Sequence, residues 1–135
     1  MKAMMLTILL VDNNPLFLKM VRNLLDPMPE VQIVGEAHDG AEGLEKAKEL
    51  QPDLILLDIA MPKMSGLDVA VRIQSWAQPP KILFLTMHDD AFYLDAARDL
   101  GAIGVVGKTD LVAELLPLIR RFVAEQKSGT FHSNR

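Results

Sequence analysis

Residues 53–66 read DLILLDIAMPKMSG, and this stretch decides the fold. Residues 54–57 form an unbroken apolar run of strand length, and Asp58 follows where Pro62 and Gly66 indicate that the chain turns. A strand without a polar face has to be covered on both sides, so helices are expected on either side of its sheet. The stretch therefore predicts a buried strand of a parallel sheet that carries an acid at its exit.

The size and composition of the chain exclude several classes of protein. With 135 residues it is one domain by length and can bury a full core. The formal charge of −4 gives no broad basic surface, so direct binding to nucleic acid or anionic lipid is not expected. Cysteine is absent, which excludes disulfides and cysteine metal sites. Because Asp12 interrupts the apolar N-terminus too early for a signal peptide or spanning helix, we expect a soluble, cytoplasmic protein.

Apolar runs and helical patterns alternate along the chain. Strands are predicted at residues 6–11, 31–35, 54–57, 82–85 and 103–106, and helices at residues 15–25, 41–50, 65–76, 92–100 and 111–124. The connections are short, and right-handed crossovers would wind such units into one parallel sheet. We therefore predict an α/β, flavodoxin-like (βα)5 fold, with a five-stranded parallel sheet of order 2-1-3-4-5 and helices on both faces.

Two of these elements are expected to be irregular, and the domain is expected to end before the C-terminus. Residues 31–35 alternate only partly, which predicts a shorter strand near a sheet edge. Pro117 lies inside the last helical pattern, so we predict a kink or a late start there. The domain is expected to span residues 5–124. Residues 125–135 are typical of a frayed tail or the beginning of a linker.

A polar residue ends or follows four of the predicted strands: Asp12, Asp58, Thr86 and Lys108. In a sheet of this order the carboxyl ends lie along one edge, so these four side chains are expected to meet. Two acids with nearby carbonyls suit a hard cation such as Mg²⁺, and a hydroxyl with an ammonium suits phosphoryl oxygens. The chain has neither of the glycine-rich loops that hold nucleotides. The combination predicts a carboxylate that itself accepts a phosphoryl group.

These segments resemble the receiver domain of bacterial two-component response regulators. The resemblance spans residues 6–123 and rests on four matches: Val11-Asp12, residues 58–66, Leu85-Thr86 and Gly107-Lys108. Residues 14–17 and 86–90 are most similar to receivers that carry a LuxR/NarL-type helix-turn-helix.

The resemblance implies a role for each matching residue. Asp58 would be the phosphoacceptor, Asp12 part of the Mg²⁺ site, Ala60 a ligand through its backbone carbonyl, Thr86 a hydrogen-bond donor to the phosphoryl group and Lys108 its counter-charge. It also implies Mg²⁺ as cofactor, a histidine kinase as partner, and partner binding or homodimer formation as output. The chain would then be a phosphoacceptor with self-phosphorylation and self-hydrolysis chemistry only, not an enzyme.

This sequence departs from the family's pattern at two positions. The family usually has a second acid after the first strand, whereas Asn13 stands there and brings no charge to a metal. We therefore predict weakened Mg²⁺ binding and slower phosphotransfer. Val105 stands where the family commonly has the Tyr or Phe that reports phosphorylation, so the signal either travels through the loop after Thr86 or is coupled atypically.

Plainer interpretations stand beside these roles. Asp12 could only cap the first helix, and Thr86 could only bond its own backbone. His88 and Asp89 are expected to be solvated loop residues rather than a metal or acid–base pair. Trp76 is either a partly buried cap on the third helix or a partner contact.

Other functions are also weighed against a phosphorylated switch. Its main alternative is a receiver-like interaction module with weak or no phosphorylation. A phosphohydrolase or a flavin-binding protein is disfavoured, because no second general base and no hydroxyl-rich phosphate loop are evident in the sequence.

Overall fold

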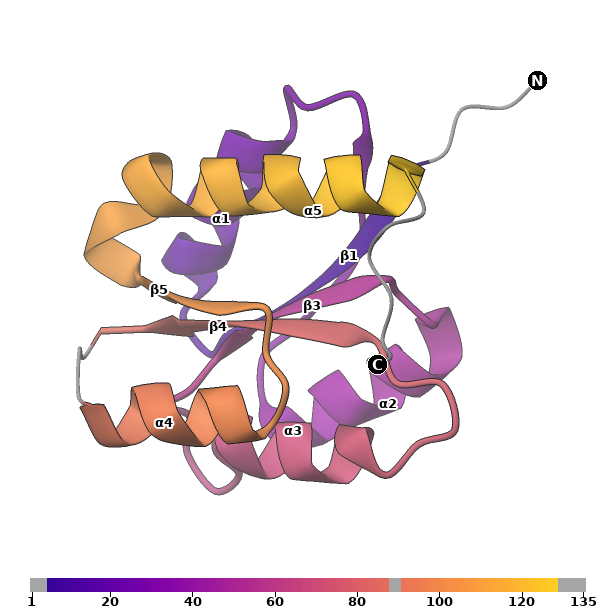
Figure 1. The fold of residues 1–135 in the computed structure, drawn as a ribbon. Helices are drawn as coiled ribbons and strands as arrows, with labels where there is room; N and C mark the ends of the chain where they lie inside the picture. The colour runs from indigo at the N-terminus through magenta and orange to yellow at the C-terminus, as the bar shows by residue number, and fades with distance from the viewer. Residues whose placement is uncertain (1–4, 88–90, 129–135) are drawn as a thin grey trace.

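The fold is described from a computed structural model that covers residues 5–87 and 91–128. Figure 1 shows one sheet between two layers of helices. The strands are β1 (Leu6–Val11), β2 (Val31–Ala37), β3 (Leu54–Asp58), β4 (Lys81–Thr86) and β5 (Gly104–Gly107). The helices are α1 (Pro15–Leu25), α2 (Gly40–Leu50), α3 (Gly66–Gln74), α4 (Ala91–Asp99) and α5 (Leu116–Ser128).

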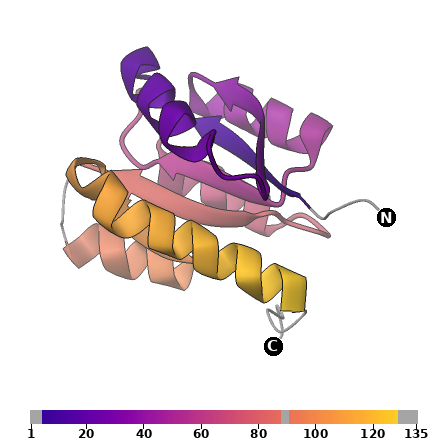
Figure 2. The same ribbon diagram turned by 90° about the horizontal axis from the view of Figure 1, so that it is seen from above.

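All strand pairs of the sheet are parallel, in the order β2-β1-β3-β4-β5. Helices α1 and α5 cover one face, and α2, α3 and α4 cover the other (Figure 1). Figure 2 shows α1 and α5 on the same face, and residues of both line a shared groove. The predicted flavodoxin-like architecture is confirmed.

Two hydrophobic clusters fill the layers because successive strand residues point to opposite faces. On β3, Leu54 and Leu56 belong to the cluster beneath α1 and α5. Ile55 and Leu57 belong to the cluster above α2, α3 and α4. All five residues of β3 are buried, so the strand has no solvent-facing side. Asp58 is therefore held at the end of the most enclosed strand of the sheet.

The helix starts follow the signals in the sequence. Asn14 Oδ1 accepts hydrogen bonds from Leu16 N and Phe17 N, which caps α1 with Pro15 in its first turn. Ser65 and Asp68 form a complete capping box at α3. Helix α3 ends at Gln74, two residues earlier than predicted, which leaves Trp76 in the following turn.

Strand β2 lies at the sheet edge as predicted, but the prediction of a short strand is wrong. It has seven residues, and its pairing with β1 slips between Ile8–Ile33 and Leu9–Gly35, which leaves Val34 as an extra residue. A bulge of this kind reverses the alternation of side chains partway along a strand. The broken pattern in the sequence therefore reports a bulge in a long strand.

The last helix confirms the late start expected from Pro117. A short 3₁₀ turn at Lys108–Asp110 and one π-helical turn at Leu111–Leu115 precede α5, so Pro117 lies in the first turn of the α-helix. Pro is tolerated in a first turn because those N–H groups have no helical partner. The helix continues to Ser128, four residues beyond the predicted helix end at residue 124. No helix of the described residues is long and apolar enough to cross a membrane.

Candidate functional site

The carboxyl edge of the sheet brings four predicted site residues to one place. Asp12 follows β1, Asp58 ends β3, Thr86 ends β4 and Lys108 follows β5. Lys108 Nζ lies 2.6 Å from Asp12 Oδ2 and 3.4 Å from Asp58 Oδ2. One ammonium therefore bridges carboxylates that come from two different strands.

Burial distinguishes this edge from the rest of the described chain. Among the described residues, the buried polar or charged residues are Asp12, Asp58 and Thr86, at 1%, 3% and 1% exposure. Charged side chains are almost never buried unless they are paired, because desolvation costs several kcal/mol per ion. Their placement together indicates a functional requirement rather than a contribution to stability.

Local backbone bonds hold both acids. Asp12 Oδ1 accepts a hydrogen bond from Asn14 N at 2.8 Å, and Asp58 Oδ1 accepts one from Ala60 N at 3.2 Å. The contact of Lys108 with Asp12 Oδ2 is an ion pair without hydrogen-bond geometry, and Oδ2 has no hydrogen-bond partner in the described part of the chain. Asp12 is therefore more than a helix cap, since one of its oxygens is buried and aimed into the site.

The loop after Asp58 is packed tightly against the strand that carries it. Gly66 N donates to Ile59 O at 2.7 Å, and Met64 N donates to Pro62 O at 2.7 Å. A Cβ atom on Gly66 would lie 2.2 Å from Asp58 O, so only glycine fits there. This loop therefore holds the backbone of Asp58 in place through close contact with Gly66.

The surroundings of Asp58 raise its pKa to about 6 from an ordinary value of 3.8. Burial is the largest cause, and the neighbouring charge of Asp12 is the second. Lys108 and the hydrogen bond from Ala60 N oppose the rise. Asp58 is consequently ionised near neutral pH but protonates readily in mild acid.

The donor set fits a hard divalent cation. Two carboxylates face one ammonium, which leaves a net charge of −1, and Asp12 Oδ2 has no hydrogen-bond donor among the described residues. The described residues contain no group of three His, Cys, Asp or Glu side chains that could hold a metal. A cation such as Mg²⁺ would therefore need backbone or amide oxygens and water beside the two acids. Ala60 and Asn13 are both exposed beside them.

One residue at this site was not predicted from the sequence. The ring of Phe17, in the first turn of α1, lies 4.3 Å from Lys108 Nζ, measured to the ring centroid. Phe17 is 7% exposed and also belongs to the cluster beneath α1 and α5. The available signal was its position, five residues after Asp12 and on the first turn of the helix that the Asp12 loop starts.

Several other residues singled out in the sequence lie elsewhere. Val105 is half-buried and packs in the cluster above α2, α3 and α4. His88 and Asp89 lie outside the described residues.

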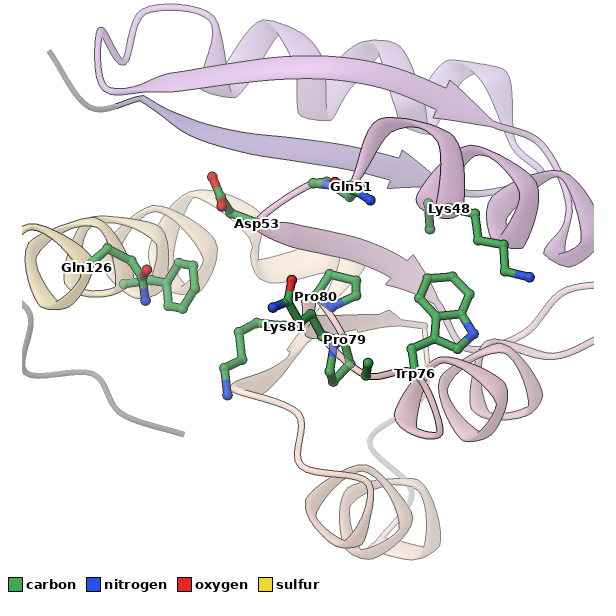
Figure 3. Close-up of a pocket in the computed structure, with 13 residues that line it drawn as sticks. Lys48, Gln51, Asp53, Trp76, Pro79, Pro80, Lys81 and Gln126 are labelled. Carbon is green, nitrogen blue, oxygen red and sulfur yellow. The ribbon is translucent and has the colours of Figure 1, made fainter. Parts of the chain in front are cut away.

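Trp76 lies at the opposite end of the sheet, in a groove of about 650 Å³ (Figure 3). Lys48 Nζ is 5.9 Å from the centroid of its ring. Asp53, Lys81 and Gln126 also line this groove. The groove around Trp76 therefore does not include the acidic site.

Comparison with known proteins identifies the family of the chain. Residues 8–120 match the family of response regulator receiver domains. The transcriptional regulatory protein LiaR of Bacillus subtilis is 34% identical over 116 residues, which cover 86% of this chain and 55% of LiaR. The nitrate/nitrite response regulator protein NarL of Escherichia coli is 33% identical over 118 residues, which cover 87% of this chain and 55% of NarL.

A solved structure is similar over nearly the whole chain. The signal receiver domain of NarL from Mycobacterium tuberculosis superposes with a TM-score of 0.83 and 32% identity, and the match covers 90% of this chain and 98% of that domain. The chain spans about half the length of the curated relatives it matches. The chain therefore belongs to the response regulator receiver domains of two-component systems, which are generally signalling modules, and its relatives include LuxR/NarL-type regulators.

Proposed function

We propose that Asp58 accepts a phosphoryl group from a phosphorylated histidine kinase and that this modification switches partner binding or dimerisation. The observation that carries the proposal is the bridge from Lys108 to two buried carboxylates at the exit of β3. Burying these three charged groups costs desolvation energy, so they are not needed for the stability of the fold. A phosphoryl group on Asp58 would lie beside the positive charge of Lys108.

The chemistry needs an ionised nucleophile and a charge to meet the phosphoryl oxygens. One carboxylate oxygen of Asp58 bonds to phosphorus while the P–N bond of phosphohistidine breaks, and the imidazole leaves with the bonding electrons and takes up a proton. Lys108 lies within reach of Asp58 and offsets the negative charge that develops. Thr86, buried at the adjacent strand end, is the proposed hydrogen-bond donor to the transferred group.

Mg²⁺ is the proposed cofactor. Asp12 and Asp58 would hold it through their carboxylates, with Ala60 contributing its carbonyl and Asn13 an uncharged amide oxygen. When bound, the ion supplies positive charge to the phosphoryl oxygens. Because Asn13 replaces an acid, this chain is proposed to bind Mg²⁺ more weakly than a receiver with two adjacent acids.

Phosphorylation would change the charge balance of the site. The two carboxylates and Lys108 now sum to −1. The phosphorylated group carries about −1.5 to −2 charges, and because Asp58 gives up its own carboxylate charge when the P–O bond forms, the site would then sum to about −1.5 to −2. To convert a two-state domain from 1:99 to 99:1, the modified form must favour the active state by about 5.5 kcal/mol. A charge change of this size in a buried site is a suitable source of that energy.

The proposal is tested with a small phosphodonor, Mg²⁺ and intact-mass spectrometry. Wild type is expected to gain the mass of one phosphoryl group, and Asp58→Ala to gain none. Asp53→Ala is the matched control, because Asp53 is an acid at the other end of β3 that accepts hydrogen bonds from Thr7. A gain in Asp58→Ala, or no gain in wild type, would overturn the assignment; the second result favours the interaction module, for which Asn13 is the specific observation.

A further inference from the structure

The ammonium of Lys108 has three neighbours rather than two. Besides the oxygens of Asp12 and Asp58, the ring of Phe17 lies 4.3 Å from Nζ. The Lys108 side chain is 10% exposed and Phe17 is 7% exposed, so little water reaches either group. A desolvated ammonium beside an aromatic face is attracted by the ring quadrupole, and this attraction is larger than at an exposed site.

The ring compensates for something that the carboxylates do not supply. Lys has three N–H donors on a flexible four-carbon stem, and its contact with Asp12 Oδ2 lacks hydrogen-bond geometry. An aliphatic side chain at position 17 could also join the hydrophobic cluster, but it would leave the ammonium against a surface without a negative face. The aromatic ring therefore has a role that packing alone does not explain.

The backbone connects this ring directly to the acidic pair. Asn14 donates its N–H to Asp12 Oδ1, and its side chain accepts the N–H of Phe17. The same short turn therefore sets the position of the carboxylate and the position of the ring. Lys108 itself begins a single 3₁₀ turn, which gives its backbone little helical support.

We propose that Phe17 is a positioning residue that holds the Lys108 ammonium at the mouth between Asp12 and Asp58. Because the ring carries no ionisable group, it keeps Lys108 in place whatever the charge state of the two acids. The inference rests on the proposed function, since the purpose of a fixed Lys108 is to meet a phosphoryl group on Asp58. Its geometric part can be measured without phosphorylation.

The experiment compares Phe17→Leu with Phe122→Leu. Phe122 is a buried Phe of the same hydrophobic cluster, on α5, and it lines the groove at the opposite end of the sheet. The first readout is the rate at which a small acylating reagent modifies Lys108 in the unphosphorylated protein, at fixed pH and without divalent ions, followed by peptide mass spectrometry. The second is the rate of phosphoryl gain from a small phosphodonor.

Phe17→Leu is expected to raise the acylation rate of Lys108 and to lower the rate of phosphoryl gain, each by about threefold to tenfold. Phe17→Tyr, which keeps the ring, should restore both rates, and Phe122→Leu should leave both unchanged. Equal effects of Phe17→Leu and Phe122→Leu would reduce Phe17 to a packing residue and overturn the proposal.

A second series keeps the test valid if Phe17→Leu does not fold. Replacing Phe17 with mono-, di- and trifluorinated phenylalanine weakens the ring quadrupole with little change of shape, so Lys108 acylation should rise stepwise with fluorine content. A flat series contradicts the proposal. If wild type gains no phosphoryl group, the proposed function fails, while the acylation series still decides whether Phe17 holds Lys108.

Discussion

Both ends of the sheet carry aspartates, which are exposed at the amino end and buried at the carboxyl end. At the amino end, Asp53 Oδ2 accepts hydrogen bonds from Thr7 N at 2.9 Å and from Thr7 Oγ1 at 3.1 Å, and Asp53 is exposed beside a groove of about 650 Å³. At the carboxyl end, Asp12 and Asp58 are buried around one ammonium, with a carboxylate oxygen that has no described hydrogen-bond donor.

The difference shows that a groove alone does not identify the charged site of this fold. In the amino-end groove, Asp53 accepts its hydrogen bonds from neutral donors. The carboxyl end holds buried charges that are incompletely paired. Unbalanced buried charge, rather than the presence of a groove, distinguishes the end of the sheet at which we propose phosphorylation.

The largest effect is expected from adding one methyl group behind Asp58. Gly66→Ala would place Cβ 2.2 Å from Asp58 O, and because that neighbour is backbone, the loop must move. We expect a loss of at least about 3 kcal/mol of unfolding free energy, measured by urea denaturation.

Gly101→Ala is the control for that substitution at the amino end. Gly101 has φ +76, and a Cβ atom added there would have no other atom within 4 Å. The loss of unfolding free energy is therefore confined to backbone strain of about 1 kcal/mol. Equal losses for the two variants would contradict the tight support of Asp58.

A somewhat smaller effect is expected from pH. Because the folded-state pKa of Asp58 is raised to about 6, the native protein binds more protons than the unfolded chain between pH 4 and 6. The contribution of Asp58 to stability is therefore full below about pH 4, falls as the pH rises through about 6, and then stays constant. The fall amounts to at most about 3 kcal/mol.

Asp58→Asn should remove this step and be more stable than wild type at pH 7 in the presence of EDTA. Asp53→Asn should keep the step, because Asp53 is exposed and accepts neutral hydrogen bonds. Urea denaturation of the three proteins from pH 4 to pH 8 checks this. Parallel pH curves for wild type and Asp58→Asn would show that the pKa of Asp58 is not raised.

The smallest effect is expected from a charge at the rim of the site. Asn13→Asp adds a carboxylate beside Asp12 and should tighten Mg²⁺ binding about tenfold, measured by isothermal titration calorimetry. Gln51→Glu adds the same charge in the amino-end groove and should leave the affinity unchanged. Equal affinities of wild type and Asn13→Asp would mean that the amide does not weaken the metal site.

The sequence predicted the fold and most of the charged site because both depend on patterns of neighbouring residues. Apolar runs place each strand, and the polar residue at each strand end must then lie on the common carboxyl edge. Asp12, Asp58, Thr86 and Lys108 were found in this way. The caps of α1 and α3 were equally local, since each side chain bonds a backbone group within three residues.

The features that escaped prediction depend on contacts between distant segments. The bulge at Val34 is defined only by the register with β1, so the sequence showed a broken alternation without its cause. The extension of α5 to Ser128 continues through residues without a strong apolar pattern. The ring of Phe17 contacts Lys108, which lies about ninety residues later in the chain. In the sequence, an apolar residue in the first turn of a helix indicates only ordinary core packing.

The bulge in β2 also affects how copies of this protein can meet. A regular, exposed strand edge invites pairing with another chain, which leads to sheet extension and aggregation. Here the outer strand β2 is interrupted by the bulge at Val34, and Lys46 Nζ donates a hydrogen bond to the carbonyl oxygen of Glu36 at 2.5 Å. The other outer strand, β5, has only four residues. Neither edge offers a long regular ladder, so the sheet is protected against growing into fibrils, and contacts between copies are left to the helical faces.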